Sequence, residues 1–279
     1  MTGPVSDRAW GARRLGLGIS GPHGTALVSR KGTESLVQRA YELGVRLFDT
    51  APSYGAGEAE KRLGEGLVRL PRFECIVSTK VGLYSSGAAR RERDFSPDTV
   101  RRSIDDSMQR LKLRKIDWLF LHGPSSAELS DGLFKAIEEE QYSGRIGLLG
   151  IAGRGEELEA ALDTGLFKLV MTPVHAALDT DQLIRLSKIR NSGAELIGIE
   201  AVAPALPRYS LPTSPGKIWR LARHAAGRAG DGPAVDHPPS EGIAWALTRG
   251  RAHRVVTTTT RMAHLEENVS AAISADDGA

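Results

Sequence analysis

Three apolar runs in this sequence each end in an ionisable residue. The run over residues 45–48 ends in Asp49, the run over 76–79 ends in Lys80, and the run over 117–121 ends in His122. Tyr54 follows Asp49 closely, in a loop that also contains proline and glycine. A phenol beside an ammonium ion, a carboxylate and an imidazole could give a proton to an oxygen atom or take one from it. The sequence therefore predicts a general acid–base centre, provided that the fold brings the four side chains together.

Each of these residues also has an ordinary structural interpretation. An aspartate such as Asp49 usually forms a turn or caps a helix. A tyrosine beside glycine usually anchors a loop, and a histidine after a strand is often a buried structural residue. Four such side chains at the ends of neighbouring strands are less easily explained in this way, so the functional interpretation is favoured.

Composition and charge narrow the class of protein. Of the 279 residues, 41% are hydrophobic and 25% are charged, which is typical of a globular protein. The net charge of +3 is too small and too dispersed to indicate nucleic-acid binding. No signal peptide and no run of about 20 apolar residues is visible, so no membrane partner is expected. The single cysteine, Cys75, excludes an intramolecular disulfide and indicates a reducing compartment, so we expect a cytoplasmic protein.

Short runs rich in valine, isoleucine and leucine alternate with longer stretches of helical spacing. Most of the short runs are continuously apolar, as in parallel strands that are covered on both faces. Eight strands are expected, over residues 14–19, 45–49, 74–80, 116–122, 146–151, 168–172, 195–201 and 254–258. The alternation predicts the α/β class and a single (β/α)8 TIM barrel domain over residues 1–279.

Helical spacing of apolar residues predicts the segments between these strands. Helices are expected over residues 33–43, 97–111, 133–142, 156–163, 181–190, 240–248 and 262–273. Thr33 is expected to cap the first helix, and Ser96 with Pro97 begins the second. The two long connections, 82–95 and 203–239, follow the third and seventh strands, and the second should hold a helix near 218–226. Both should lie at the C-terminal ends of the strands, where barrels build their active sites.

Five stretches, in the same order along the chain, resemble the aldo-keto reductases. Residues 44–55 with 60–64 resemble the first signature of that family, 78–82 its lysine strand and 116–122 its histidine strand. Residues 144–151 resemble the stretch leading into its fifth strand, and 264–268 resemble its C-terminal adenine-side helix. The motifs Asp-Thr-Ala-Pro-Ser-Tyr-Gly and Ser-Thr-Lys-Val-Gly are similar to those of bacterial short-loop members of the family, such as aldose dehydrogenases.

The resemblance implies hydride transfer between a nicotinamide cofactor and a small-molecule carbonyl or alcohol. Asp49, Tyr54, Lys80 and His122 would then be the catalytic residues. Tyr54 would donate a proton to the carbonyl oxygen as hydride arrives, and would act as the base in the oxidative direction. A Lys80 cation would favour the phenolate form of Tyr54, Asp49 would hold Lys80, and His122 would orient the substrate oxygen.

The start of the last predicted helix carries the expected cofactor contacts. Hydroxyl groups and an arginine at a helix N-terminus make an anion site that suits a ribose phosphate, so NADP is expected, with NAD as the alternative. The ordinary interpretation is a threonine cap and a surface arginine. The residues assigned to the cofactor, the last three by resemblance, are Thr258, Thr259, Thr260, Arg261, His264, Glu267 and Asn268. No metal site is expected.

Three positions depart from the pattern of the family. Relatives usually hold the nicotinamide carboxamide with Ser-Asn after the fifth strand and Gln after the sixth, where this chain has Ala152, Gly153 and Met171. Weakened NADPH binding is therefore expected. Two alternatives stay open: a non-redox barrel acting as a regulatory or binding subunit, and a lyase or epimerase using the same four residues. The side chains considered for substrate contact are Tyr84, Phe95, His175, Arg208, Tyr209 and Trp245.

Overall fold

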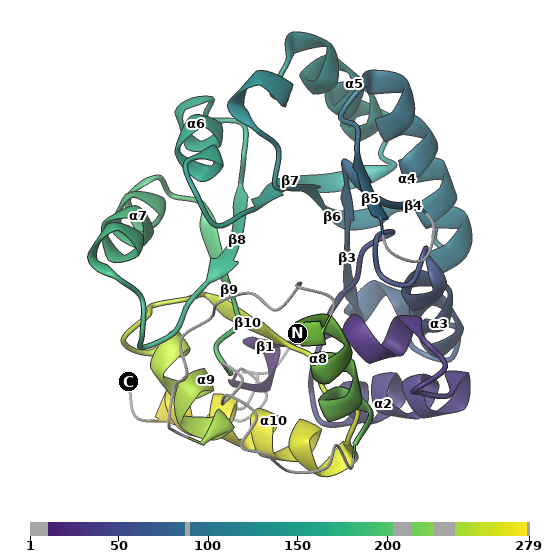
Figure 1. Ribbon diagram of the computed structural model, residues 1–279, viewed down its shortest axis with the longest axis vertical. Helices are drawn as coiled ribbons and strands as arrows, with labels where there is room; N and C mark the ends of the chain where they lie inside the picture. The colour runs from purple at the N-terminus through teal and green to yellow at the C-terminus, as the bar shows by residue number, and fades with distance from the viewer. Residues whose placement is uncertain (1–10, 87–89, 203–213, 226–237, 278–279) are drawn as a thin grey trace, which may run out of the picture.

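The strands form a closed barrel at the centre of the molecule (Figure 1). The computed structural model describes residues 11–86, 90–202, 214–225 and 238–277. All neighbouring barrel strands are parallel, in the order β1-β10-β9-β8-β7-β6-β3-β2. Their bounds are Leu15–Gly18 (β1), Leu47–Asp49 (β2), Ile76–Val81 (β3), Ile116–His122 (β6), Ile146–Ala152 (β7), Leu169–Pro173 (β8), Glu195–Ile199 (β9) and Arg254–Thr257 (β10). Each lies on one of the predicted strands, so the predicted (β/α)8 barrel is confirmed.

Helices surround the barrel and follow the strands in alternation. Their bounds are Arg30–Glu42 (α2), Glu58–Leu67 (α3), Pro97–Leu111 (α4), Asp131–Tyr142 (α5), Glu157–Asp163 (α6), Thr180–Asn191 (α7), Pro215–Ala225 (α8), Pro239–Leu247 (α9) and Met262–Asp277 (α10). The described residues also include three short 3-10 turns, at Gly21–Gly24 (η1), Arg72–Glu74 (η2) and Ser126–Glu128 (η3). The predicted extra helix near 218–226 is α8, although residue 226 lies outside the described residues.

One local prediction needs correction, and the hairpin in the connection after β3 was not predicted. Helix α2 begins at Arg30, not at Thr33, because the Ser29 hydroxyl caps it by accepting a hydrogen bond from the Gly32 amide at 3.0 Å. The long connection after β3, for which no secondary structure was predicted, contains an antiparallel hairpin of Leu83–Ser86 (β4) and Arg90–Arg93 (β5).

Helix α3 was not predicted from the sequence. Its glycines, Gly64 and Gly66, are unfavourable in a helix interior and weaken the sequence signal. The structure supplies the reason for one of them. A Cβ atom on Gly64 would lie 2.5 Å from the carbonyl oxygen of Arg110, at the end of α4. Glycine at this position therefore allows α3 and α4 to pack closely together.

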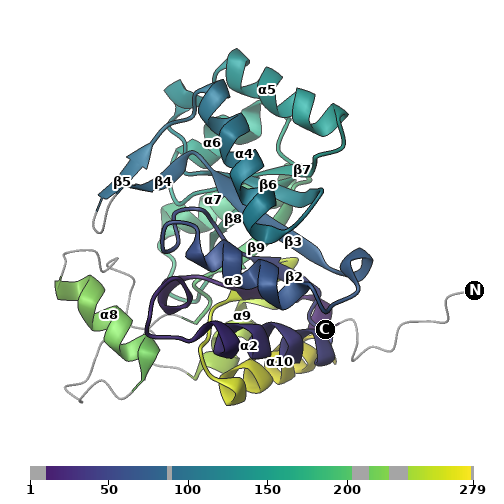
Figure 2. The same cartoon turned by 90° about the vertical axis from the view of Figure 1, so that its right-hand side faces the viewer.

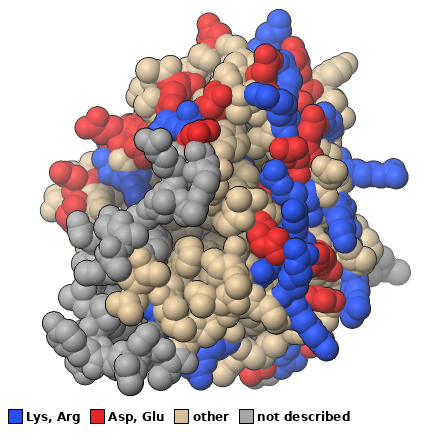
Figure 3. All heavy atoms as spheres, turned by 45° about the vertical axis from the view of Figure 1, so that its right-hand side comes forward, with Lys and Arg blue, Asp and Glu red and all other residues tan. Residues whose placement is uncertain are grey.

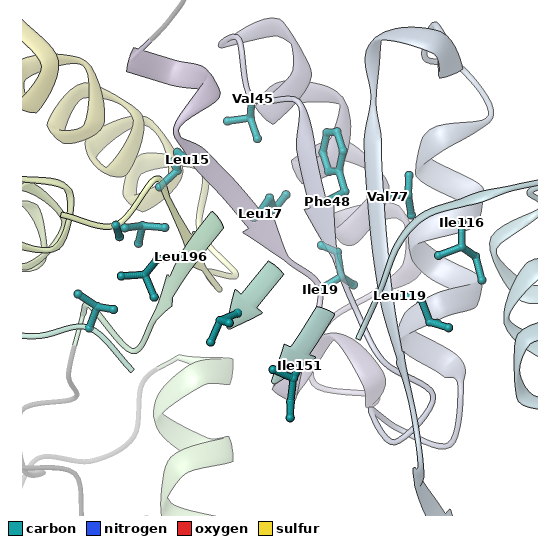
Figure 4. Close-up of a cluster of buried hydrophobic side chains, with 14 of the residues drawn as sticks. Leu15, Leu17, Ile19, Val45, Phe48, Val77, Ile116, Leu119, Ile151 and Leu196 are labelled. Carbon is teal, nitrogen blue, oxygen red and sulfur yellow. The ribbon is translucent and has the colours of Figure 1, made fainter. Parts of the chain in front are cut away.

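Alternate residues of each strand face either the barrel interior or the surrounding helices. The outward-facing side chains fill the layer between strands and helices, and Figure 4 shows several of them, including Leu15, Leu17, Phe48 and Val77. The inward-facing side chains form a second, smaller cluster of Leu47, Trp118, Phe120, Ala152, Leu169, Met171, Ile197 and Val256. Because the period of a strand is two residues, the inward set continues to Asp49, Lys80 and His122 at the strand ends.

The two ends of the barrel differ in chemistry. At the N-terminal ends of the strands, Arg254 pairs with Glu195 at 2.6 Å and lies over the ring of Trp118 at 5.5 Å. At the other end, the hairpin β4–β5 and helix α8 lie on the same side of the molecule (Figure 2). Helix α8 contacts η1, where the indole of Trp219 lies against Gly21. These elements surround the mouth of the barrel, at which the C-terminal ends of the strands lie.

Acidic and basic side chains are interleaved on the face shown in Figure 3. Ion pairs between neighbouring helices, such as Arg101 with Glu139 and Arg30 with Glu65, agree with that mixture. In the ranges that the structure describes, no helix is long and apolar enough to cross a membrane.

Candidate active site

Asp49, Lys80 and His122 lie at the C-terminal ends of β2, β3 and β6, which are neighbours in the barrel. The register places Asp49 beside Ser78, and Lys80 beside Phe120. All three polar residues belong to the inward-facing set of their strands. The closed barrel therefore brings their side chains to one side of a common mouth.

A buried ion pair forms the centre of this site. The Lys80 ammonium donates hydrogen bonds to both Asp49 carboxylate oxygens, at 2.8 and 2.7 Å, and to the carbonyl oxygen of Thr50 at 2.8 Å. Only 3% of the Lys80 side chain and 6% of the Asp49 side chain are exposed. The Ser78 hydroxyl donates a further hydrogen bond to Asp49 at 2.7 Å. The acceptors and donors of the pair are thus well satisfied, which a buried charge requires.

Burial and neighbouring charge act in opposite directions on the pKa of Lys80. Burial is the largest single influence and lowers the pKa of Lys80, but Asp49 and Tyr54, through charge and hydrogen bonding, together raise it above the usual 10.5. Lys80 is therefore an ammonium ion at neutral pH, and its charge acts on the phenol oxygen of Tyr54.

Tyr54 lies between Lys80 and His122. The Lys80 nitrogen is 5.4 Å from the centre of the Tyr54 ring, and the Tyr54 and His122 rings meet edge to face with centroids 6.3 Å apart. The loop that carries Tyr54 is held by Gly55, which has a φ of +62°. A Cβ on Gly55 would lie 2.1 Å from the carbonyl oxygen of Gly24, so only glycine allows this approach to η1.

A second buried network supports the lysine strand from the helical side. Glu60 on α3 is completely buried and accepts a hydrogen bond from the Thr79 hydroxyl at 2.7 Å. Arg110 on α4 pairs with the other Glu60 oxygen at 2.9 Å. Neither contact was predicted, nor was that of Ser78 with Asp49. The only sequence signal was the presence of Glu60 and Thr79 inside the stretches that resemble the family and that also carry the predicted catalytic residues.

The segment between β10 and α10 holds the residues assigned to a cofactor. The Thr259 hydroxyl accepts a hydrogen bond from the Arg261 amide at 3.2 Å, and the Thr258 hydroxyl lies 2.9 Å from that of Ser20. Thr260 is half-buried in the bend before α10, and the Arg261 side chain is exposed. A hydroxyl-lined helix start with an exposed cation fits an anionic group.

Along the first turns of α10, His264 and Glu267 are exposed, whereas Asn268 is buried. The Asn268 amide donates a hydrogen bond to the Thr257 hydroxyl at 3.2 Å, so it ties α10 to the end of β10. The structure therefore presents Arg261, His264 and Glu267 on the surface, and turns Asn268 toward the barrel.

His23 on η1 holds the same segment from the other side. Its Nε2 atom donates a hydrogen bond to the carbonyl oxygen of Thr259 at 2.8 Å, because a carbonyl can only accept. Its Nδ1 atom lies 2.9 Å from the Thr33 hydroxyl on α2. His23 is completely buried, and burial lowers its pKa, with the charge of Arg62 acting in the same direction. A functional or structural role for His23 was not predicted from the sequence.

The three positions that depart from the family pattern are apolar or backbone groups in the structure. Ala152 and Met171 are paired across β7 and β8 and belong to the interior cluster. The Gly153 amide donates to the Met171 carbonyl oxygen at 3.0 Å. A Cβ on Gly153 would lie 2.4 Å from the carboxylate of Glu157, which accepts hydrogen bonds from the next two amides.

The side chains considered for substrate contact lie in different environments. Tyr84 on the hairpin accepts a hydrogen bond from the Gly82 amide at 3.0 Å, and Phe95 is buried in the core. His175 is buried in the loop after β8, and Trp245 on α9 is partly buried and packs against the core between strands and helices. Arg208 and Tyr209 lie outside the described residues. Over the described ranges, no cluster of three or more His, Cys, Asp or Glu side chains could hold a metal ion.

Comparisons with known proteins identify the family to which this chain belongs. Residues 14–213 match the sequence pattern of the Aldo/keto reductase family. The chain is 28% identical over 284 residues to L-galactose dehydrogenase of Arabidopsis thaliana, covering 96% of this chain and 84% of the plant protein. It is 30% identical over 277 residues to D-threo-aldose 1-dehydrogenase of a Pseudomonas species, covering 84% of this chain and 81% of that protein.

A solved structure shares the fold as well. The holo form of an aldo-keto reductase from Bacillus halodurans superposes with a TM-score of 0.73 at 22% identity, covering 92% of this chain and 86% of that one. The matched sequence pattern includes the segments that carry Asp49, Tyr54, Lys80 and His122. The chain belongs to the aldo-keto reductase family of nicotinamide-dependent oxidoreductases.

Proposed function

We propose that this protein is an NADP(H)-dependent oxidoreductase that reduces a carbonyl, or oxidises the matching alcohol or sugar. The observation that carries the proposal is the buried ion pair of Lys80 and Asp49, placed beside Tyr54 and His122 at the mouth of the barrel. The names of the two sugar dehydrogenases among its relatives support a small polar substrate.

The proposed chemistry needs a proton at the substrate oxygen. A bound nicotinamide cofactor would supply or accept the hydride. Tyr54 is proposed to give its phenolic proton to the carbonyl oxygen during reduction, and to take it back during oxidation. The Lys80 cation stabilises the phenolate that remains, and Asp49 holds Lys80 in place by two hydrogen bonds.

His122 is proposed to orient the substrate oxygen. Its imidazole lies edge to face with the Tyr54 ring and comes from the strand next to that of Lys80. A carbonyl oxygen between the Tyr54 hydroxyl and the His122 imidazole would meet both groups. Such positioning lowers the entropic cost of reaching the reactive geometry.

The residues proposed to hold NADP lie on the segment from Thr258 to Asn268. The exposed guanidinium of Arg261, at the start of α10, is proposed to bind the ribose phosphate, with the Thr259 hydroxyl fixing the turn. His264 and Glu267 are proposed to line the adenine, and Asn268 holds the helix against β10. The buried, free Cys75 supports the proposal that the protein works in a reducing compartment, the cytoplasm.

A second candidate is a barrel without redox activity, acting as a lyase, an epimerase or a binding subunit. The side chains of Ala152 and Met171, which belong to the apolar interior cluster, favour it, because neither offers a strong hydrogen-bonding group to a nicotinamide carboxamide.

Titration of the purified protein with NADPH and with NADH, followed by fluorescence, separates the two candidates. The proposal predicts saturable NADPH binding and the appearance of NADPH from NADP with an aldose as the reductant. Absence of binding at millimolar cofactor would reject the oxidoreductase in favour of the second candidate.

A further inference from the structure

Helix α3 connects the two elements that carry Tyr54 and Lys80. It begins at Glu58, directly after the loop of Tyr54, and its first turn holds Glu60. The Glu60 carboxylate accepts a hydrogen bond from the Thr79 hydroxyl on β3 at 2.7 Å. Thr79 directly precedes Lys80, so one buried hydrogen bond joins the helix that follows the proposed acid to the strand that carries the neighbouring cation.

The loop between Tyr54 and α3 has little conformational freedom. Gly55, Ala56 and Gly57 all have left-handed backbone conformations, with φ values of +62°, +53° and +84°. This conformation is uncommon for alanine. The Tyr54 carbonyl oxygen also accepts a hydrogen bond from the Ala59 amide in the first turn of α3, at 3.3 Å. A displacement of that turn would therefore move the backbone of Tyr54 as well.

Arg110 on α4 holds Glu60 from the other side. Its guanidinium donates a hydrogen bond to the second Glu60 carboxylate oxygen at 2.9 Å and pairs with Asp106 at 3.2 Å. The same guanidinium lies against Gly57, where a Cβ atom would be 2.7 Å from its Nε atom. Glu60 is completely buried, whereas the Arg110 side chain is 25% exposed. A buried carboxylate bonded at both oxygens is held in one position.

Thr79 and Lys80 point to opposite faces of β3, as successive residues of a strand do. Lys80 points into the barrel and reaches Asp49, while Thr79 points outward to α3. The Lys80 ammonium lies 5.4 Å from the centre of the Tyr54 ring. The attraction between an ammonium ion and a phenolate falls as their separation grows, so a contact that fixes α3 on β3 also fixes this attraction.

Resting on the proposed function, we propose that Glu60 and Thr79 are positioning residues: their hydrogen bond sets the separation between the Tyr54 phenol and the Lys80 ammonium, and thereby the pH at which Tyr54 acts as the base. In oxidation, the Tyr54 phenolate takes the hydroxyl proton of the alcohol as hydride leaves for the oxidised cofactor. Both positioning residues are buried between β3 and α3, so they act only through Tyr54 and Lys80. A contact that served stability alone would leave that pH unchanged.

The test removes the Thr79 hydroxyl without altering any charge. Thr79→Val keeps the shape and strand preference of the side chain but loses the hydrogen bond. The chain has five tyrosines, so carbon-13 labels at their ζ positions give few NMR signals, and the Tyr54 signal is the one absent from Tyr54→Phe. Its titration midpoint should rise by about 0.5 pH unit or more in Thr79→Val, which corresponds to roughly 1 Å of added separation at an effective dielectric constant of about 20.

Kinetics and a conservative variant complete the test. With an aldose and NADP, the pH at which kcat is half-maximal should rise in Thr79→Val by the same amount as the NMR midpoint. KM for NADP should stay unchanged, because the segment after β10 is not altered. Thr79→Ser restores the hydroxyl and should return both midpoints to the native values. If Thr79→Val does not fold, Thr79→Ala replaces it, since the vacated space admits a water molecule to Glu60.

Two control variants loosen the same two elements elsewhere. On α3, Arg62→Lys keeps the charge but cannot bind both Val28 and Glu58 as the buried guanidinium does. At the opposite end of β3, Asp117→Ala removes the hydrogen bond that the Val77 amide donates at 2.8 Å. Both controls should lower the melting temperature and leave the titration midpoint of the proposed base at its native value.

The outcomes distinguish this inference from the proposed function. An unchanged or lowered Tyr54 midpoint in Thr79→Val, or an equal rise in either control, overturns the inference and leaves the oxidoreductase standing. If the native protein oxidises no sugar or alcohol, the proposed function fails, and the NMR titration still decides the inference. A raised midpoint that Thr79→Ser reverses then supports the positioning role.

Discussion

The proposed proton donor is a single hydroxyl on Tyr54, and its removal gives the most direct prediction. Tyr54→Phe should lower kcat by about 10²–10⁴-fold, the usual contribution of a positioned acid or base. The melting temperature should change little, because the ring keeps its edge-to-face contact with His122. Steady-state kinetics and a thermal melt measure the two effects. A kcat within threefold of the native value would show that another group carries the proton.

The buried pair of Lys80 and Asp49 yields a prediction about stability. Asp49→Asn leaves the Lys80 ammonium buried without its counter-charge, and should lower the free energy of unfolding by about 3–5 kcal/mol. Lys80→Met in the same chain removes that stranded charge. The double variant should therefore lose less stability than the sum of the two single losses. Urea unfolding of the four proteins measures this cycle, and strictly additive losses would contradict a direct pair.

At the scale of the elements, the strand ends that carry the proposed catalytic and cofactor-binding residues are held by contacts from the surrounding helices and turns. Helix α3 reaches β3 through Glu60 and Thr79, and η1 reaches the segment after β10 through His23 and Thr259. Both contacts are buried. The positions of the strand ends therefore depend on elements that carry no proposed catalytic residue.

The contact through His23 predicts a pH dependence of stability. Burial lowers the pKa of His23 below its usual 6.5, so the unfolded chain binds this proton more readily than the folded one. The free energy of unfolding should consequently fall as the pH drops below about 6.5. In His23→Gln, the contribution of this histidine to the slope of unfolding free energy against pH should disappear. Urea unfolding at pH 5.0 and pH 7.5 (values chosen to lie roughly one unit or more either side) measures the difference.

His264→Gln is the matched control for this experiment, since His264 is exposed on α10. It should keep the slope of the native protein. An unchanged slope in His23→Gln would show that other groups, rather than the bridge between η1 and Thr259, cause the acid sensitivity.

For the whole molecule, cofactor binding should appear as added stability. A ligand that binds only the folded state stabilises it by about 2.7 kcal/mol at a hundredfold excess over its dissociation constant. If Arg261 binds the ribose phosphate, NADPH should raise the melting temperature more than NADH at equal concentration. Arg261→Ala should reduce the NADPH shift to that of NADH. A larger shift with NADH in the native protein would contradict the assignment.

The control for this prediction is Arg251→Ala, a cation in the connection before β10. It should leave both shifts unchanged, because its loss alters the overall charge equally but removes no proposed cofactor contact. Equal reductions in the two arginine variants would indicate a general charge effect instead of a phosphate contact.

Sequence by itself was sufficient for the strands, most helices and the four residues at the barrel mouth. Buried parallel strands need continuous apolar runs, so an ionisable residue at the end of such a run can be recognised from the sequence alone. Barrel topology then places the C-terminal strand ends together. The predicted strand over 116–122 and the observed β6 have the same bounds for this reason. Local patterns failed at α3, where close packing against α4 requires a glycine that disfavours a helix in isolation.

Only the tertiary structure decided which side chains meet across the barrel. Arg154 and Glu200 are 46 positions apart, and no local pattern connects them. Glu60 contacts Thr79 and Arg110, and Asn268 turns inward to Thr257, because the packing of helices on closed strands brings those groups within hydrogen-bonding distance. Periodicity along a chain reports which face of an element is buried. Which residues become partners depends on barrel closure and strand register, which join distant segments in three dimensions.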